Sequence, residues 1–446
     1  MIARLAWMLA RPGRAGLGLT LLPIVAFAVV TTLMLTVIGG AQTLWNAPGD
    51  IRFIYQLLTV VALALLVVPL LSLGGAAARL AARRRDDRLA TLRLLGASTA
   101  TVSAVAVLES GALALVGALA GGVLSLAVAP LVGLIPFLGH PLGALNVLVA
   151  PWGVVAVVAG VVAVAIVSAV LGLRKVVLSP LGVRMRTDAP RQGWIAVVIG
   201  VLGIAGASFL SSALGAAGSV VIMIVMAGAA FAGALALMNL IGPWLIGVVA
   251  RRRVRSASTP AKLLAARAIL ESPKAAWRQV SASATASFVA VFAGTGAALL
   301  NLMNGEDLRD QDAMLAVDIR TGVIVTVVGT FLMVACAVGV TQAATILDRV
   351  EVNRSLGHLG TPLSVIERAR LGTVVVPLLT TSITAAVAAV VVVLPLAGLA
   401  LVLAPLSVGM IVVALLAGVG LVLLGLLATR PLQARALSTE PAAASA

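Results

Sequence analysis

Residues Val374–Ala397 read VVVPLLTTSITAAVAAVVVVLPLA, a run without a charged side chain. A helix needs about 20 apolar residues to cross the hydrocarbon core of a bilayer, and this run is long enough. Leu57–Leu73 is a second uncharged run of the same kind. The strands of a membrane-spanning barrel would instead show segments of about ten residues in which polar and apolar side chains alternate. These runs therefore predict helices that span a membrane.

The composition of the whole chain agrees with this prediction. Hydrophobic residues make up 61% and charged residues 10% of the 446 residues, whereas soluble domains carry about 45–50% and about 25%. We expect an all-α integral membrane protein with about ten transmembrane helices. The predicted spans lie at 17–40, 54–78, 101–131, 150–173, 193–213, 217–250, 281–301, 319–345, 371–398 and 404–429.

Basic residues predict the orientation of these spans. Leu17–Gly40 follows several arginines as a signal peptide would, but it is too long for a signal-peptide core and is predicted to remain as the first span. With the N-terminus inside, only Arg52, Arg309 and Arg320 among the 31 basic residues fall outside the cytoplasm. We expect both termini in the cytoplasm. The excess of arginine over lysine, with abundant Ala, Gly and Val, suggests a bacterium, so we expect a multi-pass protein of a bacterial plasma membrane.

The net charge of +16 has two interpretations, attraction to nucleic acid or membrane topology. Because the basic residues gather in the loops predicted to be cytoplasmic, topology and attraction to anionic membrane lipid explain the charge. No nucleic-acid partner is expected.

Residues for catalysis are missing from the sequence. A phosphate-binding G-x-x-x-x-G-K-[ST] loop requires a lysine after glycine, and Lys175, Lys262 and Lys274 all lack that context. The two histidines and the single cysteine lack partners at metal-ligand spacing. We therefore expect no catalytic residue, no metal site, no bound cofactor and no ATP hydrolysis by this chain alone.

Glu109 is the clearest ionisable residue inside a predicted span. Burying a charge at the centre of a bilayer costs about 2.5–3.5 kcal/mol on insertion scales, so such a residue usually has a function. Glu109 lies near the start of its span, where an interfacial carboxylate is the alternative. A carrier driven by an ion gradient would show several such groups, so this class is disfavoured.

Two pairs of similar segments indicate an internal repeat. Arg4–Arg14 corresponds to Leu264–Lys274 before spans one and seven, and Leu92–Ser98 corresponds to Leu356–Pro362 after spans two and eight. The chain is therefore predicted to hold four spans, an inserted pair and four more spans. The predicted segments are 1–53 with the first span, 54–186 as the first repeat, 187–260 as the inserted pair and a linker, 261–318 as the seventh span and a short extracellular loop, 319–437 as the second repeat, and 438–446 as a disordered tail.

A cytoplasmic helix is predicted between the second and third spans. Residues 79–96 are rich in helix-forming residues, with Leu89, Leu92 and Leu95 on one side and charged residues on a flank. Gly96 can end this helix. Its apolar face can lie against lipid head groups or against a partner protein, and the residues alone leave both open.

The same region resembles the FtsX-like permease family. Residues 83–98 pair a basic run with the sequence L-R-L-L-G-A-S, and Val107–Leu113 carries an L-x-E motif followed by Gly117, Gly121 and Gly122. The resemblance covers 55–186 well and 320–435 more loosely. The ten-span plan also resembles bacitracin-type and MacB-type permeases, although the residues between spans seven and eight are too few for their large extracellular domain.

This resemblance implies the membrane subunit of an ATP-binding-cassette (ABC) transporter. Such permeases pair with two copies of a cytoplasmic ABC ATPase, which binds ATP and Mg²⁺. Residues 83–95 and 348–359 would be coupling helices, and Gly117-x-x-x-Gly121 would allow a close helix contact, either moving or static. The coupling residues are Arg83, Arg84, Arg85, Asp87, Arg88, Leu89, Leu92, Leu95, Gly96, Arg349, Glu351, Arg354, Leu356, Leu359 and Gly360.

The short external loops bear on what such a protein transports. They favour cargo recognised within the membrane, so we expect export or extraction of a hydrophobic or amphipathic substrate such as a peptide, including antimicrobial peptides, a lipid or a lipoprotein. Two alternatives remain open. One is a membrane regulator that transmits mechanical force to an extracytoplasmic partner, and the other is an ion-coupled carrier.

Overall fold

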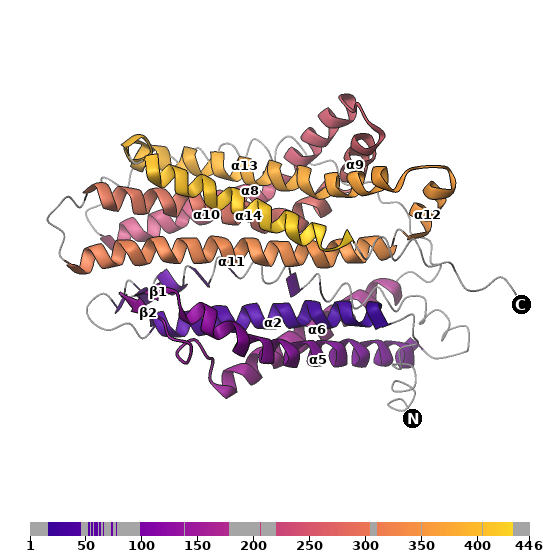
Figure 1. Cartoon of the computed structure of the whole chain (residues 1–446), viewed down its shortest axis with the longest axis horizontal. Coiled ribbons are helices and arrows are strands. Elements are labelled where there is room, and N and C mark those ends of the chain that lie inside the picture. Colours follow the sequence, from indigo (N-terminus) through magenta and orange to yellow (C-terminus); the bar gives the residue numbers. More distant parts are fainter. Residues whose placement is uncertain are drawn as a thin grey trace, which may run out of the picture. The chain divides into compact units, whose positions relative to one another are not determined.

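A computed structural model of the chain consists almost entirely of helices in the part that it describes (Figure 1). It describes residues 17–45, 99–137, 139–177, 220–303, 310–348, 350–403 and 405–430, together with Gly206 and scattered residues between 52 and 77. The chain divides into two compact units. Unit 1 comprises residues 1–187 and 339–344, and unit 2 comprises residues 188–338 and 345–446.

Most of the described elements are long helices. In unit 1 they are α2 (Leu17–Trp45), α5 (Thr99–Gly133), β1 (Pro136–Phe137), β2 (His140–Pro141) and α6 (Pro151–Val177). The other described helices are α8 (Val220–Arg255), α9 (Pro260–Glu271), α10 (Pro273–Met303), α11 (Asp310–Asp348), α12 (Val350–His358), α13 (Leu363–Leu403) and α14 (Pro405–Leu427). They belong to unit 2, except that residues 339–344 of α11 are grouped with unit 1.

The prediction of an all-α membrane protein is confirmed. Within the described residues, six helices are long and apolar enough to cross a membrane, and they correspond to the first, third, fourth, sixth, eighth and ninth predicted spans. Helices α10 and α14 lie where the seventh and tenth spans were predicted. The second span falls on the scattered residues 52–77, and the fifth lies almost wholly outside the described residues. The protein is therefore a multi-pass membrane protein.

Small residues let α2 and α5 pack closely in unit 1. A β-carbon built on Gly121 would lie 2.4 Å from the carbonyl oxygen of Ala28, and one on Gly117 would lie 2.6 Å from that of Ile24. The hydroxyl of Thr32 donates a hydrogen bond to the carbonyl oxygen of Gly121 at 3.0 Å. Since lipid tails are as apolar as leucine, close packing of this kind is what holds membrane helices together.

The connection between α5 and α6 is folded, which the sequence patterns did not predict. Strands β1 and β2 pair antiparallel, with Pro136 opposite Pro141 and Phe137 opposite His140. The turn between them includes Gly139, which has φ 76°. The segment after β2 returns to α2 so closely that a β-carbon on Gly39 would lie 1.8 Å from the carbonyl oxygen of Val147. A short loop is thus fixed against the end of a spanning helix.

The core of unit 2 forms where α10 packs against α13 and α8. Trp277 of α10 is 3% exposed, and its indole N–H donates a hydrogen bond to the side-chain oxygen of Asn239 on α8 at 2.7 Å. The hydroxyls of Ser283 on α10 and Thr381 on α13 lie 3.1 Å apart. These hydrogen-bonding contacts between helices help to fix the orientation of the helices in an otherwise apolar interface.

The predicted extracellular loop at 301–318 is shorter in the structure. Helix α10 continues to Met303 and α11 begins at Asp310. The polar residues Asp310, Gln311, Asp312 and Asp318 lowered the hydropathy of this stretch and concealed the start of the helix. As a result Asp318, which was predicted to end the short extracellular loop, lies inside a helix and is only 3% exposed.

Candidate functional site

Helix α12 occupies the place of the second predicted coupling helix, between the spanning helices α11 and α13 (Figure 1). Val352 and Leu356 lie four residues apart on one face of α12, which ends at His358. Leu359 follows three residues after Leu356 and extends this face by one position. Val352 is 59% exposed and Leu359 is 82% exposed, whereas Leu356 is half-buried. Most of this apolar face is therefore uncovered in the part of the chain that the structure describes.

A Schellman motif ends α12 and leads directly into α13. Gly360 has φ 80°, a left-handed conformation that glycine adopts without a steric penalty. Its N–H donates to the carbonyl oxygen of Gly357 at 2.9 Å, and the N–H of Thr361 donates to that of Leu356 at 3.0 Å. The carbonyl oxygen of Pro362 then accepts from the N–H of Val365 at 2.9 Å in the first turn of α13. The two helices are thus joined by a hydrogen-bonded turn rather than a loose linker.

A polar cluster joins the start of α13 to the end of α14. Glu367 and Arg430 form an ion pair at 2.5 Å, and a terminal guanidinium nitrogen of Arg370 donates to the hydroxyl of Thr429 at 2.7 Å. Because the side chain of Arg430 is 52% exposed, its ion pair contributes about 1 kcal/mol or less. The bond from Arg370 is charge-assisted and half-buried, but Nε and the other terminal nitrogen of Arg370 are buried with no hydrogen-bond partner among the described residues, which offsets part of its contribution. The ends of two long helices are held together beside the turn from α12.

No sequence pattern predicted this cluster. The one available signal was the spacing of Glu367 and Arg370, which lie three residues apart near the start of a predicted span. Thr429 and Arg430 are about sixty residues further along the chain, and no local pattern relates them to α13. The contact between the two helix ends depends on tertiary structure alone.

The first predicted coupling helix lies outside the described residues. This applies to Arg83, Arg84, Arg85, Asp87, Arg88, Leu89, Leu92, Leu95 and Gly96, and also to Arg349. Glu351 and Arg354 lie on α12. The assignment of these residues to ATPase docking stays a prediction.

Glu109 is half-buried on α5 and lies in the first turn of the candidate span that begins at Val107. This position, at the end of the span rather than at its centre, agrees with an interfacial carboxylate. Its functional role stays a prediction. Among the described residues, no group of three or more His, Cys, Asp or Glu side chains lies close enough to hold a metal ion.

Unit 1 contains an apolar cavity of about 660 Å³ between α2, α5, α6 and the residues that precede α6. Leu35, Leu119, Val123 and Val154 are among its lining residues. The two hydroxyls on its wall are directed to their own helices, since Thr36 donates to the carbonyl oxygen of Thr32 and Ser125 to that of Gly122. The cavity therefore presents almost no free polar group and suits an apolar chain or side chain.

One comparison with known proteins bears on this chain. Residues 58–181 match the family model described as FtsX-like permease C-terminal. The match includes the whole of α5, the β1–β2 hairpin and the whole of α6. It lies within the first predicted repeat and confirms the resemblance drawn from the sequence there. No match was found among curated proteins or among solved structures.

Proposed function

Because the chain is a multi-pass membrane protein of FtsX-like permease type, we propose that it is the transmembrane subunit of an ABC transporter. A separate cytoplasmic ATPase hydrolyses ATP. This chain uses the resulting movement to export or extract a hydrophobic or amphipathic substrate. The observation that supports the proposal best is α12, a capped helix with an exposed apolar face between two spanning helices.

The contacts around α12 suggest how movement would pass into the membrane. A partner that docks on Val352 and Leu359 pushes or tilts α12. The Schellman turn at Gly360 transmits this displacement to α13, because the turn is held by backbone hydrogen bonds. The ion pair and hydrogen bond at Glu367 and Arg370 then carry α14 along with α13. Docking at one short helix would in this way move α13 and α14 together.

Replacing Val352 and Leu359 with aspartate tests the docking face. Each exposed apolar side chain in a protein interface contributes about 1–2 kcal/mol. The double variant should therefore co-purify with no more than about one tenth of the ATPase that co-purifies with the unsubstituted chain. The measurement is the vanadate-sensitive ATP hydrolysis that stays with the affinity-purified full chain from its native membranes. If no such activity co-purified with the unsubstituted chain, the proposed function would be contradicted.

The matched control places two aspartates on another side of the same helix. Gly357 and His358 are exposed, and a side chain on Gly357 would meet nothing within 4 Å. The variant Gly357→Asp with His358→Asp should keep most of the ATPase. Equal loss in both variants would mean that added negative charge, rather than the apolar face, weakens the association.

Filling the apolar cavity of unit 1 tests the nature of the cargo. A β-carbon on Gly122 would lie 3.9 Å from its nearest neighbour, the Cγ1 of Val154, so Gly122→Phe can fold with its ring in the cavity. The ring would occupy the space that an apolar group of the cargo would enter. Stimulation of ATP hydrolysis by amphipathic peptides, measured in reconstituted vesicles, should therefore fall about tenfold. This corresponds to the loss of an apolar contact of about 1.4 kcal/mol.

Gly160→Phe on α6 is the control for this experiment, since a side chain there meets nothing within 4 Å and the residue does not line the cavity. Unchanged stimulation in Gly122→Phe would exclude the cavity as a cargo site. ATP hydrolysis that moves no amphiphile across or out of the membrane would favour the force-transmitting regulator. Transport without any ATPase would favour the ion-coupled carrier.

A further inference from the structure

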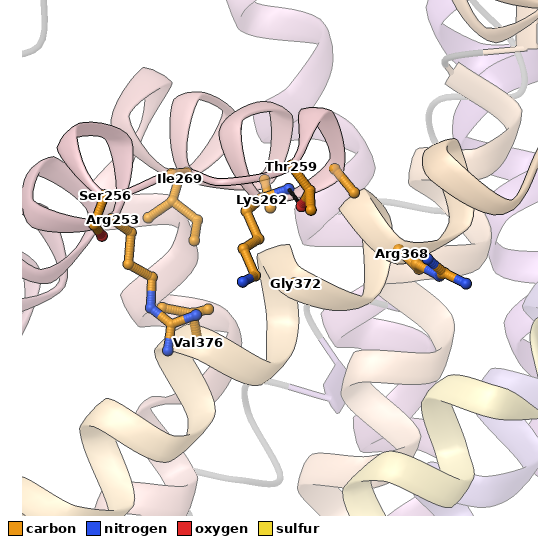
Figure 2. A pocket seen from close by; sticks show the side chains of 11 residues that line it. Arg253, Ser256, Thr259, Lys262, Ile269, Arg368, Gly372 and Val376 are labelled. Carbon is orange, nitrogen blue, oxygen red and sulfur yellow. Dashed lines mark hydrogen bonds between the residues drawn. The ribbon is translucent and has the colours of Figure 1, made fainter. Parts of the chain in front are cut away.

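A second cavity, of about 630 Å³, lies in unit 2 where the end of α8, helix α9 and the start of α13 meet (Figure 2). Its polar lining consists of basic and hydroxyl side chains: Arg253, Ser256, Thr259, Lys262 and Arg368. No acidic residue lines it. The rest of its wall is apolar and includes Ala265, Ile269 and Val376.

The basic side chains reach the cavity from three helices. Figure 2 shows Arg253 extending from α8 towards Val376, Lys262 extending from α9 towards Gly372, and Arg368 apart from both on α13. Helix α9 begins at a proline after the N-cap residue Thr259, and this places Lys262 in the first turn. The three cations are thus held by separate elements around one space.

None of the three cations has an acidic partner among the described residues. The ammonium of Lys262 donates a hydrogen bond to the hydroxyl of Ser258 at 3.1 Å, which leaves its charge uncompensated. Glu367 is next to Arg368 in the sequence, but it pairs with Arg430. Uncompensated cations around one cavity attract an anion, and guanidinium groups suit phosphate because their N–H donors match its oxygens.

The apolar wall distinguishes this cavity from a site for a free anion. Helices α9 and α13 touch at its base, where a β-carbon on Gly372 would lie 2.8 Å from that of Ala265. The candidate span of α8 ends at Arg255, and that of α13 begins at Leu363. The cavity therefore lies at the ends of two spans, where phospholipid head groups meet acyl chains.

We propose that this cavity binds an anionic phospholipid, with the phosphate among Arg253, Lys262 and Arg368 and the glycerol and acyl region against the apolar wall. This inference goes beyond the proposed function, because it requires neither an ATPase nor a cargo. A bound lipid would bridge α8, α9 and α13. A free phosphate shares the charge but would leave the apolar wall uncovered.

The test is lipid binding to the full chain in detergent, followed by native mass spectrometry. Dioleoylphosphatidylglycerol should bind at least tenfold more tightly than dioleoylphosphatidylcholine. Replacing Arg253, Lys262 and Arg368 together with glutamine should weaken binding of the anionic lipid about 100-fold, because each basic residue near an anionic surface contributes about fivefold. If the triple variant does not fold, Lys262→Gln and Arg368→Gln alone should each lose about fivefold, since both residues are exposed.

The control removes the same amount of charge outside the cavity, from helices α8 and α9. Arg251, Arg252 and Arg267 are exposed and do not line it, so replacing all three with glutamine should change affinity less than about threefold. Equal losses in the two triple variants would overturn the proposal.

Two further binding measurements distinguish a phospholipid from a soluble phosphate as the bound anion. Inorganic phosphate and glycerophosphoglycerol, which lacks acyl chains, should bind at least tenfold more weakly than the lipid. If either bound as tightly, the cavity would be a site for soluble anions and the lipid assignment would be wrong. If the cavity variant kept its lipid affinity but lost a co-purifying ATPase, the cations would bind an acidic protein surface instead.

Discussion

Replacing Gly121 with valine is expected to lower the melting temperature of unit 1 by about 10 °C. A β-carbon at this position would lie 2.4 Å from the carbonyl oxygen of Ala28 and 2.8 Å from the Cβ of Thr31. Neither atom can move aside, because the first belongs to the backbone of α2 and the second is attached directly to it. Helices α2 and α5 must therefore separate, at a cost of about 3 kcal/mol.

The separation also breaks the hydrogen bond from Thr32 to the carbonyl oxygen of Gly121. Gly122→Val is the control, since it adds the same side chain one residue later, where the nearest atom to the β-carbon is 3.9 Å away. We expect its melting temperature to change by less than about 3 °C. Similar melting temperatures for the two variants, measured by intrinsic fluorescence in the same detergent, would contradict the close contact of α2 with α5.

Replacing Gly242 with alanine is expected to destabilise unit 2 by about 3–5 kcal/mol, as much as removing a buried tryptophan. Its β-carbon would lie 2.1–2.3 Å from three ring atoms of Trp277. The ring is rigid and 3% exposed, so it cannot yield by a small rotation. It must leave its site, and the hydrogen bond to Asn239 is then lost.

A second substitution tests that explanation directly. Trp277→Leu should recover part of the stability lost in Gly242→Ala, because a smaller side chain leaves room for the added methyl group. Gly247→Ala on the same helix is the control, since its nearest neighbour lies 3.8 Å away and alanine favours a helix by about 0.5–1 kcal/mol. If thermal unfolding showed the two costs to be additive, the ring and Gly242 would not be in contact.

The class of the protein and much of its span pattern could be predicted because they depend on solvation of the backbone. In a bilayer every N–H and C=O group must be satisfied within the chain, so long uncharged runs such as Val374–Ala397 have to be helices. The end of α12 was predictable for an equally local reason, since Gly360 can adopt the left-handed conformation that the Schellman turn requires. The start of α11 was not, because polar residues at a helix end resemble a loop in a hydropathy pattern.

The sequence by itself determined that this protein spans a membrane, where most of its helices lie and that a permease-type domain is present. Only the tertiary structure decided which helices touch. A spanning helix such as α13 is apolar on nearly every side, so its periodicity does not indicate the face that packs. The pairing of Arg370 with Thr429, the contact of Gly242 with Trp277 and the gathering of Arg253, Lys262 and Arg368 around one cavity all depend on that choice of faces.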